Sequence, residues 1–256
     1  MWKDLKTQFN VIKALTIHNL QGQMSGYKYG FAWVILEPVI FIAGFRLMKK
    51  FLGGLASPPG MTPLMFYVLG VFPIFMALFG LKSYSIPVRP SKLLTFPRVT
   101  PFDLVIASNL SMFAIYFVLF WLMVVPISIY ENVWPPQDVM EVMLSLITAW
   151  IMGWSLGLVI SAPFRSFPPL KQFVGYANFA LRMSSGLFFC ITMLPLAFWP
   201  YVTWNPLFHV TELVRDAWFE GYVSPIASPT YVVECTLVLL FLGLSVERHV
   251  RRFPKI

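Results

Sequence analysis

The sequence predicts an all-α membrane protein that crosses the bilayer several times. Only 12% of the 256 residues are charged, whereas 58% are hydrophobic and 17% aromatic; a typical globular domain is about a quarter charged. The mean hydropathy is +0.72, and apolar runs of about 18 or more residues, long enough for membrane-spanning helices, recur along the chain. A soluble fold could not cover so much apolar surface, so the expected fold class is an all-α polytopic membrane protein.

The first 29 residues are expected to form an amphipathic helix in the membrane interface and a segment that leads into the first span. Trp2, Leu5, Phe9 and Ile12 recur at helical spacing, while polar and charged residues occupy the other faces. The alternative is a helix buried against a soluble element, but the chain offers little soluble material.

Six apolar segments are expected to span the membrane, within a transmembrane domain that occupies residues 30–256. In chain order the segments cover residues 30–47, 63–81, 104–129, 142–164, 173–196 and 231–246. The second, third and fourth carry no charged residue, whereas Glu37, Arg182 and Glu234 lie within the others.

Positive charge is distributed unequally between the two sides of these spans. Of the 19 Lys and Arg residues, 14 lie in the two termini and in the loops on the same side as the termini. Positively charged loops stay in the cytoplasm, so both termini are expected there. Lys49 and Lys50 lie on the opposite side, where they either reach lipid phosphates or line the exit of an anion.

Two connections are unlike ordinary loops. The cytoplasmic stretch 83–103 holds four prolines around a short segment, 91–96, that is expected to form a brief surface helix suited to docking. The outer stretch 195–229 is too apolar for a solvated loop and too polar to cross lipid, so it is expected to contain re-entrant or interfacial helices.

Charged residues in apolar surroundings need partners, because an unpaired buried charge costs several kcal/mol. Glu37 is expected to pair with Arg182 or with a cytoplasmic basic residue. Arg182 lies among small and polar residues and is the first candidate for a cation that faces a substrate. In the outer stretch, Glu212, Arg215 and Asp216 have helical spacing, which favours an ion pair at the membrane surface over a substrate contact.

Motifs for nucleotide binding and hydrolysis are missing from the sequence, including the GxxxxGK[ST] phosphate loop. If ATP drives the protein, another chain must therefore bind it. Cys190 and Cys235 each lie in an apolar run with no CxxC or histidine-rich neighbourhood, so neither a disulfide nor a metal site is expected. The basic residues lie between apolar runs rather than on one soluble face, which argues against nucleic-acid binding.

Three stretches together resemble the membrane subunit of polysaccharide-export ABC transporters, and most closely the permease of Gram-negative group 2 capsular polysaccharide exporters. They are GYKYGFAWVILEP at 26–38, LLTFPRVTPFD at 93–103 and NPLFHVTELVRDAWFEGY at 205–222. Their order and spacing cover essentially the whole chain.

The resemblance implies a type 2 ABC exporter permease fold in a bacterial inner membrane. It implies a homodimer of this chain with two copies of a cytoplasmic ATPase subunit, which would bind ATP and Mg²⁺, so that this chain would be neither an enzyme nor a cofactor carrier. The substrate would be an acidic, lipid-linked polysaccharide that passes between the two permeases toward periplasmic and outer-membrane capsule export proteins.

The resemblance also assigns expected roles to residues of two kinds. The ATPase-coupling candidates in the cytoplasmic loop are Arg89, Lys92, Leu93, Leu94, Phe96, Pro97 and Arg98. The substrate-pathway candidates, chosen for positive charge or for aromatic faces that suit sugar rings, are Tyr27, Lys28, Trp33, Arg46, Lys49, Lys50 and Arg182.

Other functions remain open from the sequence. The same architecture would serve an exporter of O-antigen, teichoic acid, small molecules or lipids. A proton-driven secondary transporter would rely on Glu37 and Glu234 and would work without an ATPase. A membrane-bound acyl or glycosyl transferase would need a catalytic constellation that the sequence does not show.

Overall fold

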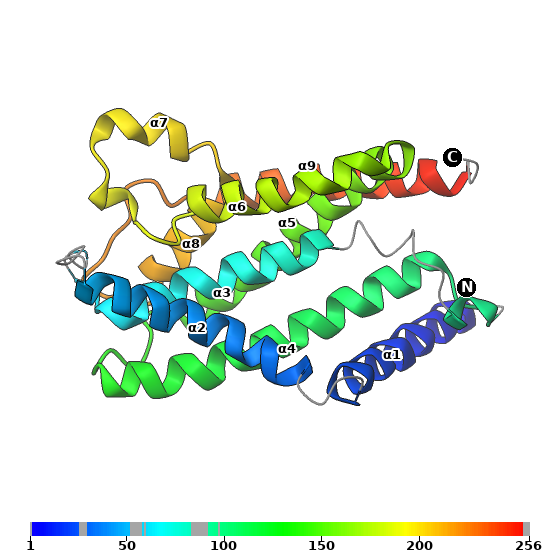
Figure 1. Ribbon diagram of the computed structural model, residues 1–256, viewed down its shortest axis with the longest axis horizontal. Coiled ribbons are helices and arrows are strands. Elements are labelled where there is room, and N and C mark those ends of the chain that lie inside the picture. The colour runs from blue at the N-terminus through cyan, green and yellow to red at the C-terminus, as the bar shows by residue number, and fades with distance from the viewer. Residues whose placement is uncertain are drawn as a thin grey trace.

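The computed structural model describes residues 2–25, 30–51, 58, 60–82, 92–96 and 98–252, and every regular element among them is a helix (Figure 1). The α-helices are α1 (Trp2–Ser25), α2 (Gly30–Phe51), α3 (Pro63–Leu81), α4 (Pro101–Tyr130), α5 (Val139–Ser166), α6 (Phe173–Ser184), α7 (Trp199–Val202), α8 (Pro206–Asp216) and α9 (Pro229–Arg252). Short 3₁₀ helices are η2 (Lys92–Thr95), η3 (Pro168–Gln172), η4 (Ile191–Met193) and η5 (Leu196–Phe198).

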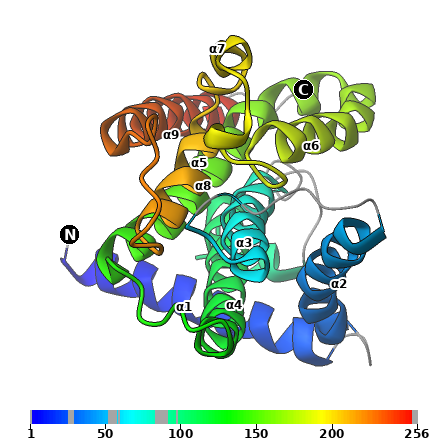
Figure 2. The same cartoon turned by 90° about the vertical axis from the view of Figure 1, so that its left-hand side faces the viewer.

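Helix α3 forms the centre of the bundle. It is apolar on all sides, with 89% of its most apolar window buried, which is the pattern of a helix enclosed by other helices. It contacts α2, α4, α5 and α8, and Figure 2 shows it lying among them. The main hydrophobic core therefore follows α3 along its length.

Glycines allow α3, α5 and α9 to approach one another closely. A Cβ atom on Gly153 of α5 would overlap the backbone of Ala77 on α3, and a Cβ on Gly80 would lie 2.5 Å from the Trp154 nitrogen. On α9, a Cβ on Gly243 would lie 2.8 Å from the Ser155 carbonyl oxygen. Small residues at such contacts are typical of helices that pack in membranes.

Within the described part of the chain, four helices are long and apolar enough to cross a bilayer: α3, α4, α5 through Pro163, and α9 through His249. Helix α2 holds a shorter apolar segment, Val34–Gly44. These helices agree with a polytopic membrane protein.

The fifth expected span, 173–196, is not one continuous helix. Helix α6 has 12 residues, about 18 Å at 1.5 Å per residue, whereas the hydrocarbon core is about 30 Å thick. Gly186 adopts a left-handed conformation with φ of 74°, and the Asn205 amide donates to the hydroxyls of Ser184 and Ser185. These contacts stop the helix and lead the chain into η4 and η5.

The expected helices of the outer stretch 195–229 are α7 and α8, which differ in burial. Helix α7 is a single turn with no buried residue, whereas α8 is buried along almost its whole length and packs against α3, α5 and α9. The N-cap of α8 is Asn205, whose side chain accepts a hydrogen bond from the Leu207 N–H.

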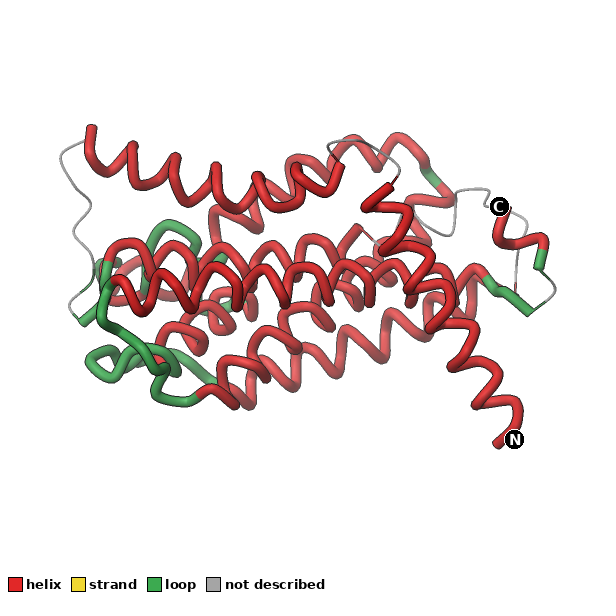
Figure 3. Tube along the Cα trace, turned by 90° about the horizontal axis from the view of Figure 1, so that it is seen from below, coloured by secondary structure: helices red, strands yellow, loops and turns green. Residues whose placement is uncertain are grey.

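Helix α1 extends over residues for which the sequence predicts an amphipathic helix and packs along α4. Leu15 is buried against Leu104 and Ala107 of α4, and the Ser111 hydroxyl donates to the Thr16 carbonyl at 3.2 Å. The beginning of α1 and the end of α9 lie at the same end of the bundle, as Figures 1 and 3 both show.

Candidate functional site

We call residues 92–98 the docking segment after their expected role. Its described residues, 92–96 and 98, lie at the end of the bundle where α1 begins and α9 ends. Its 3₁₀ helix η2 falls within the stretch for which the sequence predicts a short helix. Leu93 packs with the cluster of Leu15, Leu104 and Ala107, whereas Leu94 and Phe96 are 37% and 61% exposed. Two apolar side chains therefore project from a firmly attached segment, an arrangement suited to a partner protein.

The attachment of the docking segment continues into α4 and α1. Thr100 and Asp103 form a capping box at the start of α4, in which each side chain bonds the backbone of the other residue. The second Asp103 carboxylate oxygen accepts a hydrogen bond from the Gln8 amide of α1. A displacement of the docking segment would therefore reach both α1 and α4.

The structure describes the remaining ATPase-coupling candidates only in part. Arg98 is exposed. Lys92 belongs to η2, but its side chain is outside the described part, and Arg89 and Pro97 lie outside the described residues altogether.

Glu37 and Arg182 form an ion pair between α2 and α6. An Arg182 guanidinium nitrogen lies 3.6 Å from a Glu37 carboxylate oxygen. The guanidinium also lies 4.9 Å from the ring centroid of Phe75 and 5.5 Å from that of Phe41. Each side chain of the pair remains about a quarter exposed. The contacts hold α6 to α2 across α3 and leave the cation within reach of a further anion.

Among the other substrate-pathway candidates, only Arg46 has a described side chain. Arg46 is exposed near the end of α2 and lines a small cavity with Tyr67 and Glu131. Trp33, Lys49 and Lys50 belong to α2, but their side chains are outside the described part. Tyr27 and Lys28 lie outside the described residues.

Arg215 and Glu212 of α8 form a fully buried ion pair rather than one at a surface. Their side chains are 0% exposed and lie 3.4 Å apart. Arg215 also donates to the carbonyls of Phe189 and Phe66, and its guanidinium covers the Phe66 ring at 3.9 Å.

Glu212 has further partners in the turn that follows α8. It accepts hydrogen bonds from the hydroxyls of Tyr222 and Ser224. Burial, and then the neighbouring carboxylate, raise the pKa of Tyr222, so the phenol keeps its proton and donates. Asp216 does not join the pair and accepts instead from the Ser224 N–H at 3.0 Å. The buried pair of Arg215 and Glu212 fixes α8 to α3, and the two charges face each other rather than a substrate.

A candidate surface that sequence reasoning missed is the exposed aromatic face of α6. Phe173, Tyr176 and Phe179 recur at spacings of three residues and are 61%, 75% and 64% exposed. The spacing was visible in the sequence, but in an aromatic-rich span it did not distinguish a functional face from a packed one. Among the described residues, no group of three His, Cys, Asp or Glu side chains is placed to hold a metal ion.

Comparison with known proteins gives relatives along nearly the full chain. The chain is 27% identical over 250 residues to the polysialic acid transport protein KpsM of Escherichia coli, covering 93% of this chain and 92% of the relative. It is 27% identical over 255 residues to the capsule polysaccharide export inner-membrane protein CtrC of Neisseria meningitidis, covering 99% and 94%. With BexB of Haemophilus influenzae, which carries the same description as CtrC, it shares 26% over 252 residues, covering 96% and 93%. The chain is a homologue of this polysialic acid transport protein and of these two capsule polysaccharide export proteins.

The homology extends across the docking segment, the Glu37–Arg182 pair and α8, because each alignment covers more than nine-tenths of the chain. No protein-family model matches the chain. The relatives described as inner-membrane proteins and the long apolar helices together make this homologue a multi-pass inner-membrane protein.

Proposed function

We propose that the chain is the membrane-spanning permease subunit of an ATP-driven exporter of capsular polysaccharide. The observation that carries the proposal is the near full-length similarity to two capsule polysaccharide export proteins and a polysialic acid transport protein. One relative is named for polysialic acid, an acidic polymer. We infer an acidic, lipid-linked polymer for this chain, with ATP and Mg²⁺ bound by a partner ATPase and no catalysis by the chain itself.

The proposed topology has six crossings and cytoplasmic termini. It is supported by the location of 14 of the 19 basic residues and by the common end of the bundle at which α1 begins and α9 ends. The fifth crossing would combine α6 with the non-helical turns and short helices that follow it. Irregular backbone is tolerated at membrane depth where protein or a polar cavity surrounds it.

The proposed conduit lies between two copies of the chain, related by two-fold symmetry. The exposed aromatic face of α6 suits one wall of it, because Phe173, Tyr176 and Phe179 offer flat surfaces along which sugar rings can slide. Arg182 at the end of the same helix would attract an acidic polymer while its pairing with Glu37 keeps the attraction weak enough for release.

The partner ATPases would dock on the segment of residues 92–98. ATP-driven closure would move this segment, and its attachment to α1 through Asp103 and Gln8 and to the start of α4 would carry the motion into the spans. Periplasmic and outer-membrane capsule export proteins would receive the polymer on the other side.

Reconstitution tests the proposal directly. The chain is placed in proteoliposomes with and without the proposed partner ATPase subunit, and movement of radiolabelled capsular polymer into the lumen is measured. We expect transport only with both subunits, ATP and Mg²⁺. Polymer movement by the chain alone would instead favour a secondary transporter, and ATP-driven transport of a small lipid without any polymer would favour a lipid exporter.

Exchanging the charges of the Glu37–Arg182 pair tests what Arg182 contributes to stability and to export. Arg182→Glu alone places two carboxylates together, so we expect a lower thermal midpoint and loss of export. Adding Glu37→Arg restores opposite charges, so we expect the double variant to recover both thermal midpoint and part of the export. Thermal unfolding in detergent and export in cells are measured together. A double variant that is as stable as the wild type but inactive would show that a cation is required on α6 itself.

A further inference from the structure

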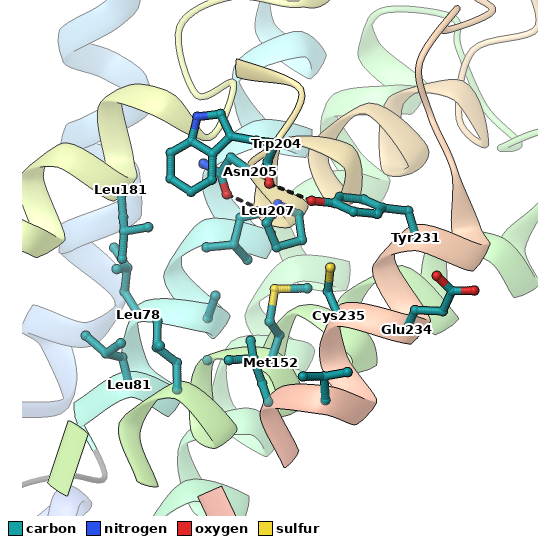
Figure 4. A pocket seen from close by; sticks show the side chains of 16 residues that line it. Leu78, Leu81, Met152, Leu181, Trp204, Asn205, Leu207, Tyr231, Glu234 and Cys235 are labelled. Atoms are coloured by element: carbon teal, nitrogen blue, oxygen red, sulfur yellow. Dashed lines mark hydrogen bonds between the residues drawn. The ribbon is translucent and has the colours of Figure 1, made fainter. Parts of the chain in front are cut away.

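An apolar groove lies between α3, α5, α6 and α9 (Figure 4). Its volume is about 540 Å³, and it is open along one side. Figure 4 shows Leu181 and Leu78 on one wall facing Met152 and Cys235 on the other, with Trp204 and Asn205 above them. Glu234 also lines the groove, and Figure 4 shows its carboxylate turned away from Leu78 and Leu181. Most of the other lining side chains are apolar.

The groove exists because α8 extends along only part of α3. Near its start, Leu207 packs in one cluster with Ala77 and Met152, and near its end Arg215 bonds the Phe66 carbonyl. Helix α8 therefore lies beside α3 between Phe66 and Ala77, antiparallel to it. Beside the last turn of α3, which ends at Leu81, the space between α6 and α9 is the groove.

One end of the groove is closed by hydrogen-bonded residues. The Tyr231 hydroxyl of α9 donates to the Trp204 carbonyl at 2.7 Å, which joins α9 to the start of α8. The opposite end lies beside Leu81 and Leu239, toward the end of the bundle that holds the docking segment. A long, flexible occupant would therefore enter from that end.

The surroundings of the groove indicate its occupant. Helix α9 is the least buried of the four long apolar helices, with 17% of its window buried, and Leu237, Val238 and Phe241 are 59%, 59% and 72% exposed. Val238 also lines the groove, which is therefore continuous with this exposed apolar face of α9. Water does not fill apolar cavities of this kind, and protein in a membrane gains packing energy from close contacts on all sides.

We propose that the groove binds one acyl chain of a phospholipid from the leaflet nearest the docking segment. The chain lies between α6 and α9, with its methyl end below Trp204 and Asn205. It completes the packing that α8 leaves unfilled. The site goes beyond polymer export, because it requires only that the protein lies in a bilayer.

Photo-cross-linking in liposomes tests the site. The full chain is reconstituted with phosphatidylethanolamine and phosphatidylglycerol that carry a diazirine near the end of one acyl chain, and modified peptides are mapped by mass spectrometry. We expect adducts on Met152 and Leu156, two of the three α5 residues that line the groove. Adducts confined to outward-facing α9 residues such as Phe241 would overturn the proposal.

Neighbouring residues on α9 provide matched variants. Val238 and Leu237 are equally exposed, but only Val238 is among the residues that line the groove. Val238→Trp should reduce the α5 adducts several-fold, whereas Leu237→Trp should leave them unchanged. Equal labelling of the two variants would contradict the proposed site.

Oxidative cross-linking tests a second copy of the chain as the occupant. Cys235 lines the groove and is partly exposed, whereas Cys190 is buried. Oxidation with copper phenanthroline should yield no disulfide-linked dimer through Cys235 if lipid fills the groove. A dimer that disappears in Cys235→Ser would overturn the lipid assignment. The photo-cross-linking and the oxidation need neither the ATPase nor the polymer. A negative result would therefore reject the lipid site without rejecting the proposed transport function.

Discussion

Phe96→Asp is expected to abolish polymer export and polymer-stimulated ATP hydrolysis while leaving the protein folded in the membrane. Phe96 directly follows η2 in the docking segment and is 61% exposed, so a charged side chain there breaks no internal packing. At an interface, loss of a central apolar anchor costs about 2 kcal/mol or more, which lowers affinity by more than about tenfold. Co-purification of the ATPase, ATP turnover with and without polymer, and surface capsule would be measured on the same cells.

The conservative change Phe96→Leu should retain most activity, because it keeps an apolar side chain at the proposed contact. Val223→Asp is the matched control on a different surface, since Val223 is 77% exposed in the turn after α8. We expect Val223→Asp to export normally. Full export by Phe96→Asp would refute the assignment of residues 92–98 as the ATPase contact.

Local chemistry in the sequence was enough to predict a short helix within residues 91–96 and the pairing choices of Glu37. Prolines on both sides limit a helix between them to a few residues, and the structure has η2 there. A charged side chain in an apolar span needs a partner, and Arg182 was one of the few available. The structure places the two 3.6 Å apart.

The end of α6 and the burial of α8 could not be predicted in the same way. Hydropathy averages over many residues, so it did not detect that the chain turns at Gly186. Nor did it detect the hydrogen bond that the Asn205 amide donates to the hydroxyl of Ser185, 20 positions earlier. The polar face of α8 predicted a membrane surface. In the structure that face meets carbonyls of α3 and of residue 189 and the hydroxyls of Tyr222 and Ser224. These long-range partners have no local signature in the sequence.

The buried cluster around Arg215 leads to the second large expected effect. Gly70 makes room for the cluster, because a Cβ there would lie 2.6 Å from the Arg215 guanidinium. Arg215→Met would remove the donor to two carbonyls and leave the Glu212 carboxylate buried without its cation. Removal of one partner from a buried ion pair typically costs about 3–5 kcal/mol. We therefore expect a sharply lower thermal midpoint in detergent and little folded protein in the membrane.

A double-mutant cycle separates the lost pair from lost packing. Glu212→Gln keeps acceptors for Tyr222 and Ser224 without the negative charge. Arg215→Met with Glu212→Gln should therefore be more stable than Arg215→Met alone, with a coupling energy of about 0.5–3 kcal/mol. Arg46→Met, at an exposed arginine of α2, should change the midpoint little. If Arg215→Met unfolds at the wild-type temperature, the cluster does not stabilise α8, and its role would have to be sought in transport instead.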